Sequence, residues 1–176
     1  MPRFLTFVLS AALAIAASVP ARADDTAEFM KRFSGKWIGT GQLLFVTTAT
    51  SEFACELSGD PSETQLTFGM KGTCRMGSLA APVHASLRYN ADTNEFYGQF
   101  MDGAEGMGVD IVGTRAGQGF SLKLVRGATQ GRLTAETVGK SEMKVVMYFK
   151  TKTGEEVPVV SMGFTRKEVI TGSIEP

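Results

Sequence analysis

The sequence predicts an all-β fold: an antiparallel up-and-down barrel of eight to ten strands, preceded by one short helix. Apolar and polar residues alternate with period two through most of the chain after residue 35. Segments of about ten residues are separated by short turns, which is typical of antiparallel hairpins. Closing the sheet into a barrel also removes its unpaired edges. A sandwich of two sheets is the alternative.

The first residues have the pattern of a cleaved secretory signal peptide. Arg3 supplies a positive charge, residues 4–19 form an apolar run, and Ala21 and Ala23 place small residues where a signal peptidase cleaves. A transmembrane anchor is the alternative, but the run is shorter than the roughly 20 residues needed to span a bilayer. We therefore expect residues 1–23 to be removed and the protein to be periplasmic or secreted.

Removal of residues 1–23 takes away Arg3 and Arg22, so the 18 basic residues of the full chain become 16, against 18 acidic residues. This weakly acidic, mixed charge argues against nucleic acid as a partner. No second long apolar segment follows, and we expect a soluble protein without stable membrane insertion. The expected organisation is one barrel domain, residues 24–167, with a flexible tail, residues 168–176.

The mature chain opens with a predicted short helix. Asp25 can cap it, and Glu28 completes a capping box. Phe29 and Phe33 recur at helical spacing, and Gly35 is expected to end the helix.

The rest of the chain is predicted to form strands joined by turns. The turns are expected at residues rich in Gly, Asn, Asp and Pro, including residues 59–62 and 90–94. The predicted strands are residues 36–47, 52–57, 64–75, 83–90, 95–101, 107–114, 119–125, 130–138, 142–151 and 157–166.

Both cysteines of the chain, Cys55 and Cys74, belong to the mature part. Export to an oxidising compartment favours a disulfide between them. Two buried free thiols or a metal pair are the alternatives, although the spacing lacks the closely spaced ligand pairs of zinc sites.

Strand alternation predicts an inner barrel face rich in Phe and Met. An eight-stranded barrel of this kind is either filled by side chains or holds one ligand. A cavity for a small apolar ligand is the first hypothesis, and a structural or interaction module with a solid core is the second. The candidate cavity residues are Phe45, Phe68, Phe100, Phe120, Met147 and Phe149.

Residues 33–41 contain the pattern G-x-W-x-G-x-G, formed by Gly35, Trp37, Gly39 and Gly41. This resembles the opening motif of lipocalin-like (calycin) barrels, in which a short helix leads into the first strand and the Trp closes one end. The resemblance implies that a basic residue late in the last strand packs over that Trp. Arg166 is the matching candidate, and we interpret Trp37 and Arg166 as structural residues that close the barrel.

The longer form of the motif is similar to the nitrobindin type of barrel. Those proteins bind haem through a histidine late in the chain, whereas the only histidine here is His84, in a middle strand. The resemblance therefore implies the fold without the haem chemistry. In overall plan the chain also resembles small exported bacterial proteins that have no assigned activity.

No pattern in the sequence organises a catalytic or metal site. His84 has no partner motif, and we expect it at the surface near a strand end. The acidic, glycine-rich residues 102–110 lack calcium-loop spacing and are expected to form a loop at the barrel mouth. Met70, Met76, Met101 and Met107 offer thioether ligands for copper, but alternation favours core positions for several of them. We expect no metal and no cofactor, and an enzyme is the least favoured class.

Overall fold

A computed structural model describes residues 21–44, 50–101 and 108–167 of the chain. Residues 1–20 of the expected signal peptide, the expected tail at 168–176 and the cavity candidate Phe45 lie outside the described residues. So do residues 102–107 of the acidic loop, which include Met107.

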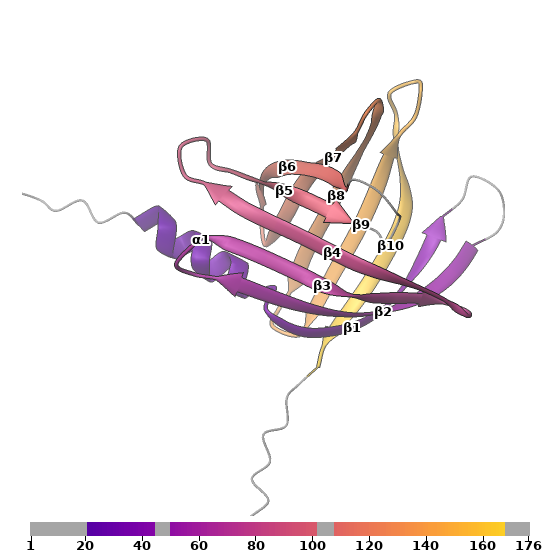
Figure 1. The fold of residues 1–176 in the computed structure, drawn as a ribbon, viewed down its shortest axis with the longest axis horizontal. Helices are drawn as coiled ribbons and strands as arrows, with labels where there is room; N and C mark the ends of the chain where they lie inside the picture. Colours follow the sequence, from indigo (N-terminus) through magenta and orange to yellow (C-terminus); the bar gives the residue numbers. More distant parts are fainter. Residues whose placement is uncertain (1–20, 45–49, 102–107, 168–176) are drawn as a thin grey trace, which may run out of the picture.

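One helix precedes ten antiparallel strands, and consecutive strands are hydrogen-bonded neighbours throughout (Figure 1). The elements are α1 (Ala21–Lys31), β1 (Gly35–Leu44), β2 (Thr50–Ser62), β3 (Thr67–Met76), β4 (Leu79–Asn90), β5 (Glu95–Met101), β6 (Val109–Ala116), β7 (Gly119–Arg126), β8 (Thr129–Val138), β9 (Glu142–Lys150) and β10 (Glu156–Arg166).

The sheet closes on itself because β1 pairs with both β2 and β10. Trp37 of β1 lies opposite Leu57 on one side and opposite Arg166 on the other. The predicted up-and-down barrel with a short N-terminal helix is therefore confirmed, and the sandwich alternative is wrong.

The turn expected at residues 59–62 is not a turn. β2 continues through these residues to Ser62, where it pairs with Thr67 of β3. Beyond Gly59, β2 has no β1 partner in the described part of the chain, so Pro61 interrupts no second hydrogen-bond ladder. The chain turns only afterwards, through Leu66, whose φ is 49°.

The helix begins earlier than its capping signal indicates. It starts at Ala21, so Asp25 lies inside it and is not its N-cap. This extension belongs to the uncleaved chain, in which the strong helix formers Ala21 and Ala23 of the expected signal peptide precede Asp25. After Lys31 the chain makes three successive i to i+3 backbone hydrogen bonds, and Gly35, with φ 91°, then starts β1.

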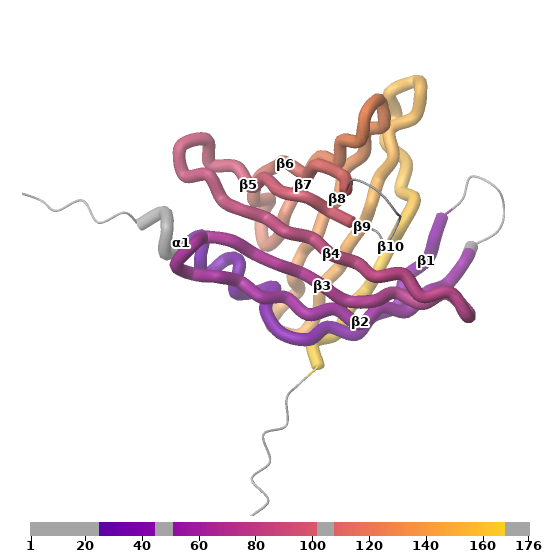
Figure 2. Tube along the Cα trace, in the orientation of Figure 1, coloured from indigo at the N-terminus to yellow at the C-terminus, as the bar shows by residue number. Residues whose placement is uncertain are grey.

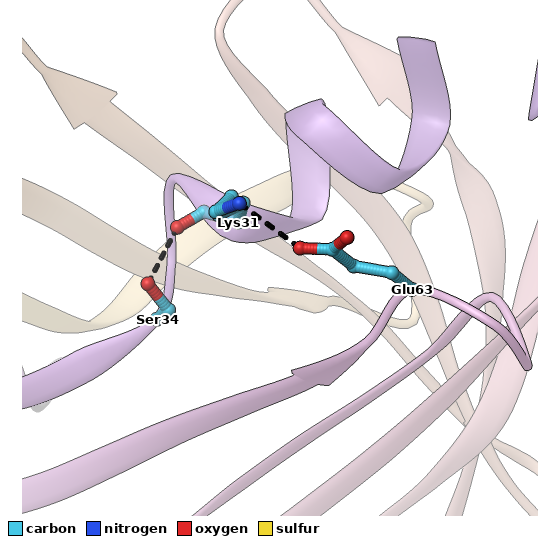
Figure 3. A network of polar contacts seen from close by, with 3 residues as sticks. All are labelled: Lys31, Ser34 and Glu63. Carbon is cyan, nitrogen blue, oxygen red and sulfur yellow. Dashed lines mark hydrogen bonds and ion pairs between the residues drawn. The ribbon is translucent and has the colours of Figure 1, made fainter. Parts of the chain in front are cut away.

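Helix α1 lies at one end of the barrel, opposite the end where the β3–β4 hairpin projects (Figure 1). Phe29, Met30 and Phe33 are buried at or after its last turns. Figure 3 shows how its C-terminal end is held: Ser34 Oγ donates to the carbonyl of Lys31 at 2.7 Å, and Lys31 Nζ contacts Glu63 Oε1 at 3.0 Å. That ion pair is exposed and contributes little, so the helix is held mainly by its apolar face.

The inner face of β1 carries Trp37, Gly39 and Gly41, all of them buried. A Cβ atom on Gly39 would come within 2.3 Å of the Gly163 carbonyl oxygen and 2.5 Å of Phe164 Cδ1. The glycine therefore lets the Phe164 ring of β10 occupy the space beside Trp37. The G-x-W-x-G-x-G pattern is thus a packing pattern for the closed end of the barrel.

We predict that Gly39→Ala lowers the free energy of unfolding by about 1–3 kcal/mol, because the added methyl group overpacks this contact. Gly163→Ala is the matched control, since a Cβ atom there meets nothing within 4 Å. Urea unfolding of both variants checks the prediction. Equal stabilities for the two variants would contradict it.

Candidate ligand-binding site

The end of the barrel beside α1 is closed by aromatic side chains. The Phe120 ring of β7 lies 4.8 Å from each of the Phe29 and Phe33 rings and 5.0 Å from the Phe96 ring, measured between centroids. Phe68 of β3 lies 6.0 Å from Phe33. Such aromatic pairs add to the burial of their apolar area, so this cluster forms a fixed floor inside the barrel.

Trp37 and Arg166 meet at the same end. Trp37 is completely buried, and its Nε1 donates to the Phe33 carbonyl at 3.0 Å. The Arg166 guanidinium carbon lies 4.3 Å from the centre of the Trp37 ring. The structure thus places the two residues in the cation–π contact that the resemblance implies.

The Arg166 guanidinium also ties the helix end to the sheet. It donates to the carbonyls of Ser34 and Arg32, the latter at 2.6 Å, and to that of Lys140 in the β8–β9 turn at 2.8 Å. The first two carbonyls follow the C-terminal end of α1, where a positive charge is favourable. Burial lowers the pKa of this guanidinium from its usual value.

A cavity of about 540 Å³ lies inside the barrel above this floor. Its described lining is almost entirely aliphatic, aromatic or sulfur-containing. The lining residues are Phe33, Leu43, Phe53, Leu57, Phe68, Met70, Cys74, Arg75, Met76, Leu79, Ala80, Ala81, Val83, Ala85, Leu87, Phe100, Ile111, Phe120, Leu122, Leu133, Ala135, Met143, Val145, Met147, Val160, Met162 and Phe164.

The structure brings four of the six cavity candidates together. Phe68, Phe100, Phe120 and Met147 all line the cavity. Phe149 does not, and the expectation for it is wrong: its side chain is 45% exposed. Burial decreases along the inner face of β9 from Met143 to Phe149, because the strand runs past the cavity toward the open end.

Sequence reasoning missed the small residues that leave the cavity open. Ala85 of β4 and Ala135 of β8 both line it, on the same strand faces as larger apolar residues. The alternation pattern could have identified their faces. It gave no sign that these positions border empty space, because alternation reports a direction and not the distance to the opposite wall.

Cys55 and Cys74 lie directly opposite each other on β2 and β3 and are joined by a disulfide, with their Cα atoms 4.0 Å apart. Cys55 is buried, and Cys74 lines the cavity. The bond therefore joins two neighbouring strands within the cavity wall. A disulfide fits an oxidising compartment.

The cavity lining extends onto the β3–β4 hairpin through Met76, Leu79 and Ala80. This hairpin projects to the side opposite α1 (Figure 2). Leu79 at its tip lines the cavity and is nevertheless 67% exposed. Arg75, at the end of β3, is the only charged residue among the described lining residues. Among the described lining residues, the open end of the site is therefore apolar with one positive charge beside it.

The remaining sequence candidates lie elsewhere. His84 is exposed and lies opposite Lys71 and Met101 in the sheet. Met70 and Met76 line the cavity, whereas Met101 is exposed. Across residues 21–44, 50–101 and 108–167, no three His, Cys, Asp or Glu side chains are grouped so that they could hold a metal ion. None of the helical segments in these ranges is long and apolar enough to cross a membrane.

Comparison with known proteins supports the fold. No family model and no curated protein matches the chain. Among solved structures it is similar to the S-type phycobiliprotein lyase CPES from Guillardia theta, with a TM-score of 0.57 and 10% identity over 85% of this chain and 99% of that one. It is also similar to Rv2717c from M. tuberculosis, with a TM-score of 0.58 and 12% identity over 81% of this chain and 98% of that one. The resemblance to lipocalin-like barrels is confirmed at the level of fold.

Arg166→Met is expected to lower the free energy of unfolding by about 2–4 kcal/mol, because it removes three charge-assisted hydrogen bonds and the cation–π contact. Urea unfolding followed by the fluorescence of Trp37, the only tryptophan, measures the loss. Arg88→Met, on the exposed outer face of β4, is the matched control and should change stability by no more than about 0.5 kcal/mol. A similar loss in both variants would show that Arg166 has no special role.

Proposed function

We propose that this protein binds and carries one small apolar molecule inside its barrel, after export to the periplasm or the outside of the cell. The observation that carries the proposal is the cavity of about 540 Å³ with an aliphatic and aromatic wall. Its volume lies within the range of ligand sites, roughly 300–1,000 Å³. A ligand that fills the cavity removes its own apolar surface and that of the cavity wall from water. This burial stabilises the complex by about 25 cal/mol per Å².

The shape of the site supports binding in one orientation. The aromatic floor around Phe120 closes one end, and the exposed Leu79 tip lies at the other. A ligand would enter past the β3–β4 hairpin and stop at the floor. The wall offers contact area rather than groups that exchange protons, which favours binding over catalysis.

Export is supported by two independent features. Residues 1–23 carry the signal-peptide pattern, and the Cys55–Cys74 disulfide suits an oxidising compartment. A role in the cell envelope fits both. The fold similarity to a phycobiliprotein lyase adds no ligand to the proposal, because at 10% identity it concerns the fold alone.

An interaction module with a solid core is the less favoured function. The described side chains leave the interior of the barrel open, whereas a solid core would fill it. An envelope partner could still contact the outer surface of a ligand carrier, so the two functions are compatible at the surface and differ in the interior.

Filling the cavity should abolish ligand binding. Ala85→Phe places a ring in the space that Ala85 borders, between Met70 and Phe100 of the neighbouring strands, and should weaken binding of the neutral probe N-phenyl-1-naphthylamine at least tenfold. Probe fluorescence measures it. Ser86→Phe, the adjacent exposed position on the opposite face, is the matched control and should bind like the unaltered protein.

Binding that is unchanged in the folded Ala85→Phe variant, or undetectable in the unaltered protein, would exclude a ligand site in this cavity. Circular dichroism of both variants separates loss of binding from loss of fold.

The mature protein from a periplasmic extract should have the intact mass of residues 24–176, lower by two hydrogens because of the Cys55–Cys74 disulfide. Native mass spectrometry of the same sample should also show a bound small molecule. A mass that still includes residues 1–23, or one that is two hydrogens higher because both cysteines are free thiols, would contradict export through this signal.

A further inference from the structure

We propose that the ligand is an anionic amphiphile: a single apolar chain that fills the cavity and ends in a negatively charged head group, which pairs with Arg75 at the mouth. The inference rests on the proposed function and extends it, because it specifies the polarity of the ligand and its orientation.

The first observation is the distribution of charge in the wall. From the floor at Phe120 to the mouth, the described lining is apolar except for the residue at the outer end of β3, Arg75. A charged head group buried among the inner residues would cost several kcal/mol without a partner. The ligand's charge must therefore lie at the mouth, and its apolar part must point toward the floor.

The second observation is the continuity between the wall and the surface. Arg75 lies opposite Ala80 in the β3–β4 pairing, one pair from the turn that Met76 and Leu79 flank. Ala80 and Leu79 line the cavity and are exposed as well. The apolar surface thus extends out of the barrel along the hairpin, and the cationic residue lies beside it. A molecule longer than the cavity would keep its apolar contact there while its head group reached Arg75.

The sign of the charge follows from the same geometry. The Arg75 guanidinium presents a planar fork of donors that suits a carboxylate or another oxyanion. A cationic head group in the same place would be repelled, and a neutral one would gain no ion pair. Arg75 is exposed, so the preference for an anion should be modest and should weaken as salt concentration rises.

A second basic residue provides a control on the same hairpin. Arg88 of β4 is also exposed, but it borders a separate hollow on the outer face of β3, β4 and β5, together with Tyr97 and Ser86. Arg88 does not line the cavity. The two arginines therefore have the same charge and are both exposed, but they have different positions relative to the proposed ligand.

The experiment compares three ligands with one chain length: laurate, 1-dodecanol and dodecyltrimethylammonium. Each competes with N-phenyl-1-naphthylamine for the mature, disulfide-bonded protein, below the concentration at which the ligand forms micelles. Laurate should bind about fivefold more tightly than dodecanol, and the cation more weakly than dodecanol. The laurate preference should decrease in high salt.

Arg75→Gln should remove the preference, so that laurate and dodecanol bind this variant with equal affinity. Arg75→Lys should keep most of the preference, and Arg88→Gln should keep all of it. Each variant's affinity for the neutral probe reports whether the cavity is intact.

The outcomes separate the two proposals. If neither the probe nor any of the three ligands binds, the proposed function fails and this inference fails with it. If the probe and dodecanol bind but laurate binds no better, the carrier function stands and the anionic ligand is excluded. A laurate preference that survives Arg75→Gln, or that disappears equally in Arg88→Gln, would also overturn the assignment to Arg75.

Discussion

The contact of Arg166 with the end of α1 makes the two ends of the barrel different, one closed and one open. A closed ring of ten strands has two equivalent openings until something covers one of them. Here the guanidinium packs on Trp37 and donates to carbonyls at the helix end and at the β8–β9 turn, so the helix, the first strand and the last three strands are joined at one place. With one end covered in this way, the interior becomes a pocket with a floor and a mouth instead of a channel.

Small residues have opposite effects in the two halves of this interior. At the closed end, Gly39, two residues from Trp37 on the same face of β1, makes room that the Phe164 ring occupies, and the result is dense packing. Further up, Ala85 and Ala135 border space that no described side chain fills. The fold is thus dense where stability is needed and open where a ligand can fit, and the residue opposite each small side chain decides which result follows.

Much of this architecture could be predicted from sequence, because it follows from period-two alternation and short turns. All ten strands belong to that part, and the helix follows from apolar residues at helical spacing. The Cys55–Cys74 pair was predicted from export to an oxidising compartment, and the Trp37–Arg166 contact from the resemblance to lipocalin-like barrels. The prediction of a turn near Pro61 was wrong because turn-forming residues do not reveal that β2 has lost one neighbour, β1, and still pairs with β3. The prediction that Phe149 lines the cavity was wrong because alternation gives the face on which a side chain lies and not its position along the barrel axis. Arg75 was missed for a related reason, since only the three-dimensional position of the β3–β4 hairpin places it beside the cavity.

The disulfide in the cavity wall links the chemistry of the interior to the compartment in which the chain resides. Reduced, Cys55 and Cys74 would each carry a weak S–H group, and no covalent bond would join β2 to β3 in the cavity wall. Oxidation consumes both thiols and leaves an inert sulfur surface between β2 and β3. The wall of the cavity is therefore closed covalently between β2 and β3 only after the chain is oxidised, so the spacing of these two strands is fixed by the same step that removes both thiols.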